Sequence, residues 1–187
     1  IAVDTEKEEV FEEVVSKVDE LLSKKAESQT SDYQPATFDS AVDALPDANM
    51  VVISVPGEYA ADEAKKALNK GIHVMLFSDN VPIEKEIELK KLAHEKGLLV
   101  MGPDCGTAII NGVPLCFANA VNKGDIGIVG ASGTGIQEVS SIIGKLGSGI
   151  TQAIGTGGRD LRAEVGGIMM IDGIRALQKD PNTEVIV

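Results

Sequence analysis

Hydrophobic residues recur along the chain with two different periods, and the alternation of these periods predicts a succession of strands and helices. Short apolar runs rich in β-branched residues predict buried strands at 50–55, 73–77, 98–101, 126–129, 150–154 and 183–187. Apolar residues at helical spacing predict helices at about 58–70 and 82–96, from Gly133, and from about Val165. Strands that alternate with helices predict an α/β fold with parallel sheets.

The first part of the chain has a different pattern. Thr5 and Glu8 have the spacing of a capping box, and a helical apolar pattern with acidic residues on its other face predicts a long helix from about Glu6 to Ala26. The segment 28–35 is polar and without periodicity, which predicts a linker, and a short helix is expected at 38–45.

The segment 107–122 is irregular, and Asn111-Gly112 followed by Pro114 predicts a small hairpin within it. We expect a domain boundary near Lys123. The chain begins at Ile1 and ends at Val187 with residues typical of strand interiors. We therefore expect it to be part of a longer protein, truncated at both ends, whose sheet edges favour self-association into a homo-oligomer.

The net charge of −12 is unevenly distributed. Residues 1–123 hold 22 acidic and 12 basic residues, a balance of −10, whereas 124–187 hold seven acidic and five basic residues, a balance of −2. This surplus argues against binding to nucleic acid or to an anionic membrane. With no leader and no spanning segment in the sequence, a cytoplasmic location is expected.

Neither the cysteines nor the histidines have the spacing of a metal site, so no metal is expected. Cys105 and Cys116 are expected to be small, half-buried residues without a disulfide. His73 begins a predicted strand and His94 lies on the apolar edge of a predicted helix, which favours structural roles for both.

The segment 124–161 holds two strands that each end in a glycine loop. In the first, the sequence from Gly130 to Gly135 leads from a strand into a helix that ends at Gly147, with Ser132 as the expected N-cap. The first N–H groups of that helix, with about half a positive charge from its dipole, form a site for an anion. A tight strand-to-helix turn without a ligand explains the glycines equally well, so both interpretations stay open.

The amino-acid sequence of this loop excludes three common motifs. A Walker loop requires Lys where Ile136 stands, a nucleophile elbow requires Gly where Thr134 stands, and the dinucleotide fingerprint requires Gly where Ser132 stands. All three arginines, Arg159 among them, follow the second glycine loop and are suited to oxyanion recognition.

Three further loops follow predicted parallel strands, at 56–58, 78–80 and 102–107. Each is compatible with ordinary turn chemistry, but the carboxyl ends of parallel strands meet at one edge of a sheet. The three loops together therefore predict a pocket.

Two sets of motifs resemble a known superfamily. The succinyl-CoA synthetase alpha subunit is similar in Val-Met-Gly-Pro-Asp-Cys-Gly at 100–106, Gly-Ile-Val-Gly-Ala-Ser-Gly-Thr at 127–134 and Ile-Gly-Thr-Gly-Gly-Arg-Asp at 154–160. The FdrA-type proteins of that superfamily, the NDP-forming acyl-CoA synthetases, are similar in Leu-Pro-Asp-Ala-Asn at 45–49, Gly-Glu-Tyr-Ala-Ala at 57–61, Phe-Ser-Asp-Asn-Val at 77–81 and Gly-Arg-Asp-Leu at 158–161.

The resemblance implies two doubly wound parallel-sheet units that follow an acidic helix and linker at 1–30. A Rossmann-like CoA-binding-type domain is expected at 31–123, and the first part of a flavodoxin-like succinyl-CoA synthetase-type domain at 124–187. It implies phosphate binding by Gly130, Ser132, Gly133, Thr134 and Arg159, and a CoA-side pocket formed by Pro56, Ser78, Asp79, Pro103 and Asp104. The phosphohistidine motif of the family lies beyond the end of this chain, so the catalytic residue is not assigned.

Three functions follow from the resemblance. The first is an acyl-CoA-synthetase-like subunit that handles a carboxylic acid, its acyl phosphate and CoA, with nucleotide and Mg²⁺ supplied through a β-type partner subunit or the C-terminal remainder of the same protein. The second is an FdrA-type acyl or carbamoyl transferase subunit that uses phosphate without CoA. The third is a non-catalytic subunit that senses a metabolite or completes a partner.

Overall fold

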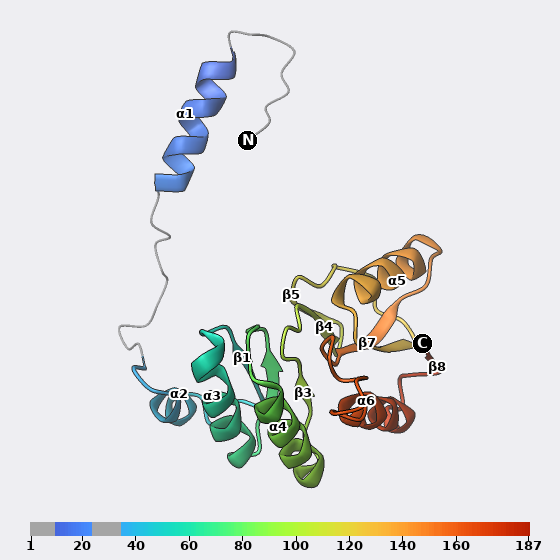
Figure 1. Cartoon of the computed structure of the whole chain (residues 1–187). Coiled ribbons are helices and arrows are strands. Elements are labelled where there is room, and N and C mark those ends of the chain that lie inside the picture. Colours follow the sequence, from blue (N-terminus) through green and yellow to red (C-terminus); the bar gives the residue numbers. More distant parts are fainter. Residues whose placement is uncertain (1–9, 24–34) are drawn as a thin grey trace. The chain divides into compact units, whose positions relative to one another are not determined.

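The computed structural model describes residues 10–23 and 35–187, and the chain divides into two compact units, 1–41 and 42–187. In the first unit, helix α1 spans Val10–Ser23, which confirms the predicted helix over these residues (Figure 1). The capping box at Thr5 and Glu8 and the linker up to residue 34 lie outside the described residues. Helix α2, Phe38–Ala44, is the short helix expected there.

In the second unit, one sheet is fully parallel, with the order β1-β2-β3. Its strands are β1 (Met50–Ile53), β2 (His73–Leu76) and β3 (Val100–Met101), joined by helices α3 (Gly57–Asn69) and α4 (Ile83–Lys96). Helix α3 packs on β1 and β2 through a buried face made mostly of alanines, which allows the helix to approach closely. The predicted alternation of strands and helices in this segment is confirmed.

The second sheet is mixed, with the order β5-β4-β7-β6-β8. Its strands are β4 (Thr107–Ile110), β5 (Val113–Cys116), β6 (Ile126–Gly130), β7 (Ile150–Gly155) and β8 (Val185–Ile186). Strand β6 is parallel to β7 and β8, as predicted, whereas β4 is antiparallel to β5 and β7. Helix α5 (Gly133–Lys145) contacts β4, β6 and β7, and helix α6 (Ile168–Lys179) contacts β6 and β8.

The predicted α/β fold is confirmed, and the predicted hairpin adds an antiparallel pair to the parallel strands of the second sheet. Asn111 and Gly112 have positive φ values of 52° and 80°, and they form the two-residue turn that joins β4 to β5. Such a turn reverses the chain within one hairpin, which a parallel crossover cannot do. The predicted hairpin is confirmed, and it belongs to the second sheet.

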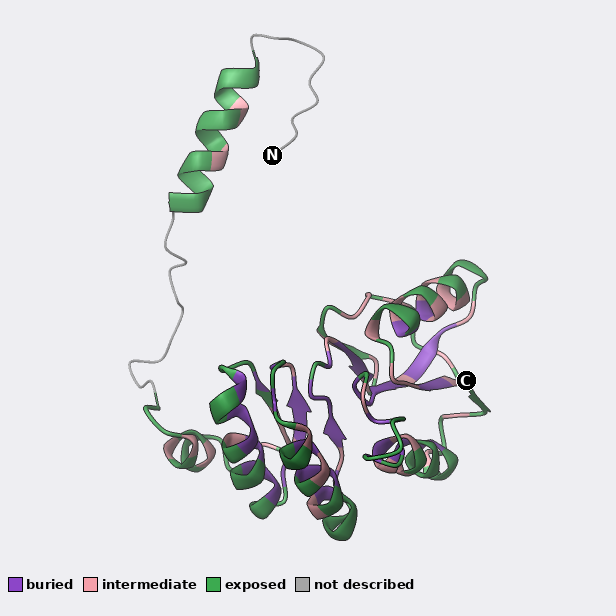
Figure 2. Ribbon diagram, in the orientation of Figure 1, coloured by how far each residue is buried: buried purple, intermediate pink, exposed green. Residues whose placement is uncertain are grey.

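The core of the second unit runs from one sheet to the other (Figure 2). Met75 of β2 and Met101 of β3 share a buried cluster with Val129 of β6, Ile154 of β7 and Leu177 of α6. A second cluster packs Ile136 of α5 onto the other face of β6 and β7. The apolar contacts therefore join the two sheets into one unit, and the proposed domain boundary near Lys123 stays a prediction.

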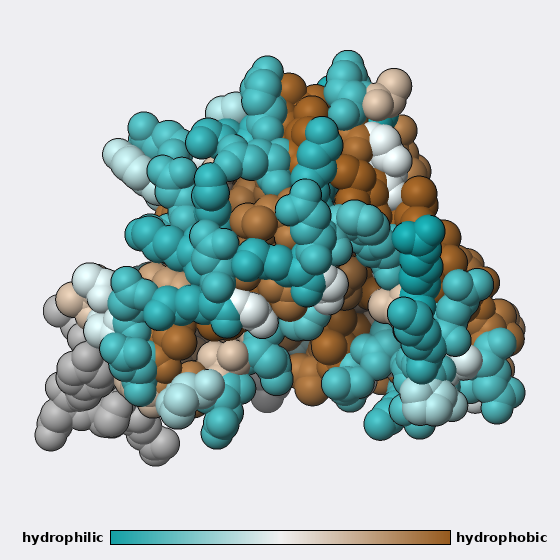
Figure 3. Space-filling model, turned by 90° about the horizontal axis from the view of Figure 1, so that it is seen from below, coloured by the Kyte–Doolittle hydropathy of each residue, from teal (hydrophilic) through white to brown (hydrophobic). Residues whose placement is uncertain are grey.

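Most of the surface seen in Figure 3 is hydrophilic, with apolar side chains in smaller patches between the polar ones. Leu45, Tyr59 and Leu146 are among the large apolar residues that stay exposed. Over residues 10–23 and 35–187, none of the helices combines the length and the apolar composition that crossing a membrane requires.

His73, at the start of β2, leads to a pH prediction for stability. Its Nδ1 accepts a hydrogen bond from the Leu99 N–H at 3.0 Å, and burial lowers the pKa of the ring below its ordinary value of 6.5. Because the folded state then holds the proton less tightly than the unfolded state, this contribution to stability is present above about pH 6.5 and is lost as the pH falls through the folded pKa. We expect the urea midpoint to fall more between about pH 7 and pH 5 in wild type than in His73→Asn, whose amide oxygen also accepts the bond. Equal falls of the urea midpoint in wild type and in His73→Asn would contradict this prediction.

Candidate functional site

The first glycine loop places Ser132 at the start of α5, as the sequence predicts. Ser132 has an extended backbone (φ −95°, ψ 113°), and its Oγ accepts a hydrogen bond from the Gly135 N–H at 3.1 Å. The Thr134 hydroxyl lies 3.3 Å from the Ser132 hydroxyl. By helix geometry, the N–H groups of Gly133 and Thr134 have no carbonyl partner within the helix. The loop therefore presents backbone donors and two hydroxyls at the positive end of the helix dipole.

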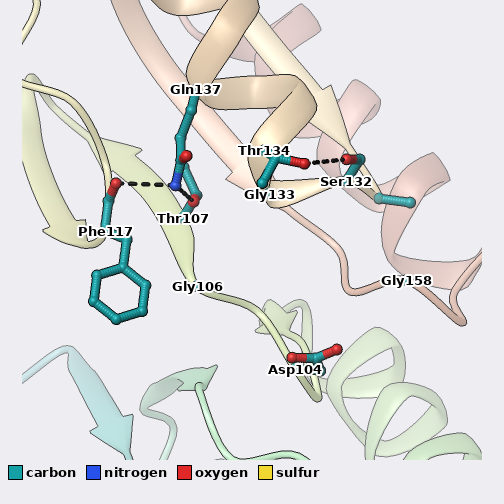
Figure 4. Close-up of a pocket in the computed structure, with 10 residues that line it drawn as sticks. Asp104, Gly106, Thr107, Phe117, Ser132, Gly133, Thr134, Gln137 and Gly158 are labelled. Atoms are coloured by element: carbon teal, nitrogen blue, oxygen red, sulfur yellow. Dashed lines mark hydrogen bonds between the residues drawn. The ribbon is translucent and has the colours of Figure 1, made fainter.

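These donors face a cavity of about 470 Å³ (Figure 4). The cavity lies among the ends of β6 and β7 and the hairpin, and its lining consists of Asp104, Gly106, Thr107, Phe117, Ala131, Ser132, Gly133, Thr134, Gln137 and Gly158. Asp104 is the single charged residue of this lining. Because no lining residue is cationic, the groups of this lining that favour an anion are the backbone N–H groups, the hydroxyls of Ser132 and Thr134 and the positive end of the helix dipole.

A second cavity, of about 570 Å³, lies beside the first at the carboxyl ends of the parallel strands. It is lined by Ser54, Val55, Pro56, Phe77, Ser78, Asp79, Asp104, Gly106 and Phe117. Asp104, Gly106 and Phe117 line both cavities, so the two form one cleft. The structure thus brings together the loops that the sequence predicted to converge.

The geometry of the second cavity depends on close contact between its loops. The Ser78 hydroxyl is buried and donates to the Val55 carbonyl at 2.6 Å, which ties the end of β2 to the end of β1. A Cβ on Gly57 would lie 2.3 Å from the Asp79 carbonyl oxygen, so only glycine allows α3 to begin there. Ser78 therefore positions the wall of the cavity, and its hydroxyl proton is not free for a ligand.

Two residues in the cleft, Gln137 and Phe117, were missed in the sequence. Gln137 Nε2 donates to Thr107 Oγ1 at 2.9 Å and to the Phe117 carbonyl at 3.1 Å, which joins α5 to the hairpin. The Phe117 ring makes an edge contact with the Phe77 ring, with 5.4 Å between their centroids. The only signal for Gln137 was its place in the second turn of the helix that Ser132 caps, and nothing local marked Phe117, whereas Thr107 belongs to the loop 102–107 that was predicted to line a pocket.

Three of the predicted site residues do not line either cavity. The Arg159 guanidinium points away, with Nε 2.8 Å from Glu86 Oε2 and Nη2 donating to the Val81 carbonyl at 2.8 Å. The Gly130 carbonyl accepts the Thr156 N–H at 2.9 Å, and the Pro103 carbonyl packs against Gly157. The place of Arg159 after the glycine loop was evident from the sequence, but the buried carboxylate of Glu86 that pairs with it was not.

The histidines lie outside the cleft. His73 is held by Leu99, and His94 Nδ1 lies 2.7 Å from Asp172 Oδ2 in a groove between α4 and α6. Within the described ranges, no three His, Cys, Asp or Glu side chains gather closely enough to hold a metal ion.

The two cysteines are free and differ in burial, instead of both being half-buried. Cys105 lies in the core, and burial raises the pKa of its thiol to about 11, whereas Cys116 is exposed. Because the thiolate is the reactive form, we expect iodoacetamide at about pH 8 to label Cys116 in the folded protein and Cys105 only after unfolding. Mass spectrometry of tryptic peptides checks this, and native labelling of Cys105 at the rate of Cys116 would contradict it.

The chain is similar to several known proteins. Residues 121–187 match the CoA binding domain family. The uncharacterized protein YahF of Escherichia coli (strain K12) is 57% identical over 175 residues, which cover 94% of this chain and 34% of that protein. The alpha subunit of the ADP-forming succinate–CoA ligase of Aquifex aeolicus is 33% identical over 149 residues, 75% of this chain and 47% of that subunit.

A solved structure has the same fold. The ATP citrate lyase from Methanothrix soehngenii, in complex with citrate and coenzyme A, superposes with a TM-score of 0.70 at 22% identity, over 80% of this chain and 26% of that chain. This chain therefore spans between about a quarter and about a half of the length of these three proteins. The family match falls on the segment for which the sequence predicted the flavodoxin-like domain, and the proposed domain limits stay a prediction.

Proposed function

We propose that the cleft is the substrate site of an acyl-CoA-synthetase-like subunit, on the premise that the chain is a homologue of succinyl-CoA ligase alpha subunits and NDP-forming acyl-CoA synthetases. The cavity at the start of α5 holds the phosphoryl group of an acyl phosphate. The second cavity receives CoA. We also propose that the chain belongs to the FdrA-type branch of the NDP-forming acyl-CoA synthetase superfamily.

The proposal rests on one observation: the cavity at the N-terminus of α5 and the second cavity share lining residues. The N–H groups after Ser132 stabilise the negative charge of a phosphoryl group, and the hydrogen-bonded hydroxyls of Ser132 and Thr134 leave one further O–H to donate to it. Asp104, Gly106 and Phe117 line both cavities. An acyl group that extends from the phosphate towards these three residues therefore meets a second reactant from the other side.

A second candidate is the FdrA-type acyl or carbamoyl transferase that uses phosphate without CoA. The lining of the second cavity favours it, because it includes the carboxylates of Asp79 and Asp104 and no Lys or Arg. Carboxylates repel the phosphates of CoA, whereas they accept hydrogen bonds from the N–H groups of a carbamoyl group.

The curated relatives named as alpha subunits support a partner for this chain. We propose that nucleotide and Mg²⁺ reach the cleft through a β-type subunit or through further sequence of the same protein. Assembly into a homo-oligomer is also proposed, and light scattering of the purified chain tests it. A monomer at high concentration would exclude it.

Calorimetric titration with phosphate, acetyl phosphate, carbamoyl phosphate and CoA tests the function. Binding of phosphate and acetyl phosphate supports the anion site, and additional binding of CoA without competition from phosphate supports the acyl-CoA-synthetase-like role. Binding of carbamoyl phosphate with no binding of CoA favours the second candidate. If none of the four ligands binds, the proposed function is wrong.

Gly158 provides a variant that is matched to this titration. It lines the first cavity, and a Cβ built on it meets no atom within 4 Å, so a side chain fits there without backbone strain. We expect Gly158→Val to weaken phosphate binding by occupying the cavity and Gly158→Ala to weaken it less. Unchanged binding in Gly158→Val would place the anion elsewhere.

A further inference from the structure

Four charged side chains are packed together behind the second glycine loop. Glu86 and Lys90 come from α4, whereas Arg159 and Asp160 come from the loop after β7. The side chains of Lys90 and Asp160 are fully buried, that of Glu86 is 1% exposed and that of Arg159 is 30% exposed. Burying charges costs free energy unless they are paired and hydrogen-bonded, so the number of contacts made by each group matters.

The Lys90 ammonium uses all three of its N–H groups. It donates to Glu86 Oε1 at 2.8 Å, to Asp160 Oδ1 at 2.9 Å and to the Thr156 carbonyl at 2.9 Å. Two of these three acceptors belong to the second glycine loop, which is 66 and 70 residues away in the sequence. Lys90 therefore fastens this loop at both of its ends to a helix of the other sheet.

The contacts continue from Lys90 into the walls of the first cavity. The Thr156 N–H donates to the Gly130 carbonyl at 2.9 Å, and Gly130 is the residue from which the chain turns towards Ser132. Between the two fastened residues, Gly158 lines the cavity itself. Lys90 thus acts on both glycine loops, although it touches neither the cavity nor any ligand in it.

The Asp160 carboxylate, which accepts from Lys90, also binds the start of α6. The Asp160 carboxylate accepts the Met169 N–H at 3.3 Å and the Met170 N–H at 2.9 Å, both in the first turn of that helix. The Thr156 side chain does not help to fix the loop, since its buried Oγ1 has no hydrogen-bond partner in the described part of the chain. The backbone contact to Lys90 is therefore the one that holds this residue from the α4 side.

We propose that Lys90 is a positioning residue of the anion site, which sets the spacing between the two glycine loops through the Thr156 carbonyl and the Asp160 carboxylate. The inference rests on the proposed function for the identity of the site. The ammonium suits this role because it is a compact charge with three donors, whereas the guanidinium of arginine is planar and larger. Lys90→Arg is therefore not a conservative change here.

The test uses Lys90→Met, which keeps the length of the side chain and removes the charge. Amide hydrogen exchange is measured over 156–170 and, as an internal reference, over α3, and phosphate affinity is measured by calorimetry. Lys91→Met is the matched control, because Lys91 is the next residue on α4 and is exposed. We expect faster exchange over 156–170 and phosphate binding about tenfold weaker in Lys90→Met, as for the loss of one positioning hydrogen bond, with no change in Lys91→Met.

Two further arms keep the proposal falsifiable if Lys90→Met does not fold. The double variant Glu86→Gln, Lys90→Met removes one charge of each sign and leaves Asp160 on the N–H groups of α6. In wild type, phosphate should slow exchange over 156–170 as well as at the start of α5, because coupling between the loops is reciprocal.

The outcomes separate the inference from the proposed function. A folded variant with wild-type exchange over 156–170, or with wild-type phosphate affinity, overturns the role of Lys90 while the anion site stands. Protection by phosphate that is confined to the start of α5 also overturns it. If wild type binds no phosphate, the proposed function is wrong, and the exchange of the variants alone decides whether Lys90 positions the loop.

Discussion

Replacing Gly133 by valine is expected to abolish phosphate binding. A Cβ at this position would lie 3.2 Å from Thr107 Oγ1, tighter than most real contacts, and the two methyl groups of valine would extend the clash. The side chain would also cover the N–H groups at the start of α5 that an anion must approach. Calorimetric titration of wild type and Gly133→Val with phosphate measures the effect, and circular dichroism verifies that the variant is folded.

Ser132→Ala is the graded control for this prediction. It removes the hydroxyl that accepts the Gly135 N–H but leaves the backbone donors open. We expect it to reduce stability or affinity by about 0.5–2 kcal/mol, the usual range for a lost N-cap. Equal phosphate affinity in wild type and folded Gly133→Val would mean that the loop is only a tight turn, and the anion site would then be wrong.

Asp160→Ala is expected to lower the free energy of unfolding by about 3–5 kcal/mol, because removing one member of a buried ion pair leaves the other charge under-compensated in a site that is fully buried. The carboxylate accepts from Lys90, and its two oxygens also bind the Met169 and Met170 N–H groups. The loss therefore combines an ion pair with the N-terminal partners of α6. Urea unfolding followed by circular dichroism at constant pH measures it.

Glu63→Ala is a suitable control, since Glu63 forms an exposed ion pair with Lys66 one turn away on α3, at 2.7 Å. Such surface pairs contribute about 0–1 kcal/mol. Asp160→Asn keeps an acceptor for the helix and isolates the role of the charge. A loss of less than about 1 kcal/mol in Asp160→Ala would show that the buried cluster is not a stabilising centre of the fold.

Local chemistry made several parts of the structure predictable. Ser132 before Gly133-Thr134-Gly135 and a helical apolar pattern defines an N-cap, because the cap depends only on neighbouring residues. Gly97 ends α4 in the left-handed conformation for the same reason. The hairpin at Asn111-Gly112 is also a local event, since these residues adopt the positive φ values that a two-residue turn requires.

Long-range packing decided what these patterns left open. The sequence placed Arg159 beside a glycine loop and indicated oxyanion binding, but the structure turns its side chain to the buried Glu86, which is distant in sequence. In the same way, nothing near Lys90 marks it as buried, since it stands in a helix rich in charged residues that are mostly exposed.

The sequence by itself determined the order of strands and helices, the cap of α5 and the loops that meet at the carboxyl ends of the strands, because periodicity and turn chemistry are encoded in neighbouring residues. Only the tertiary structure decided that β4 and β5 join the second sheet, that Phe117 and Gln137 complete the cleft, and that Lys90 holds the second glycine loop. Each of these features depends on contacts between segments far apart in the chain. The free energy of such contacts comes from burial and pairing that exist only once both sheets have packed together.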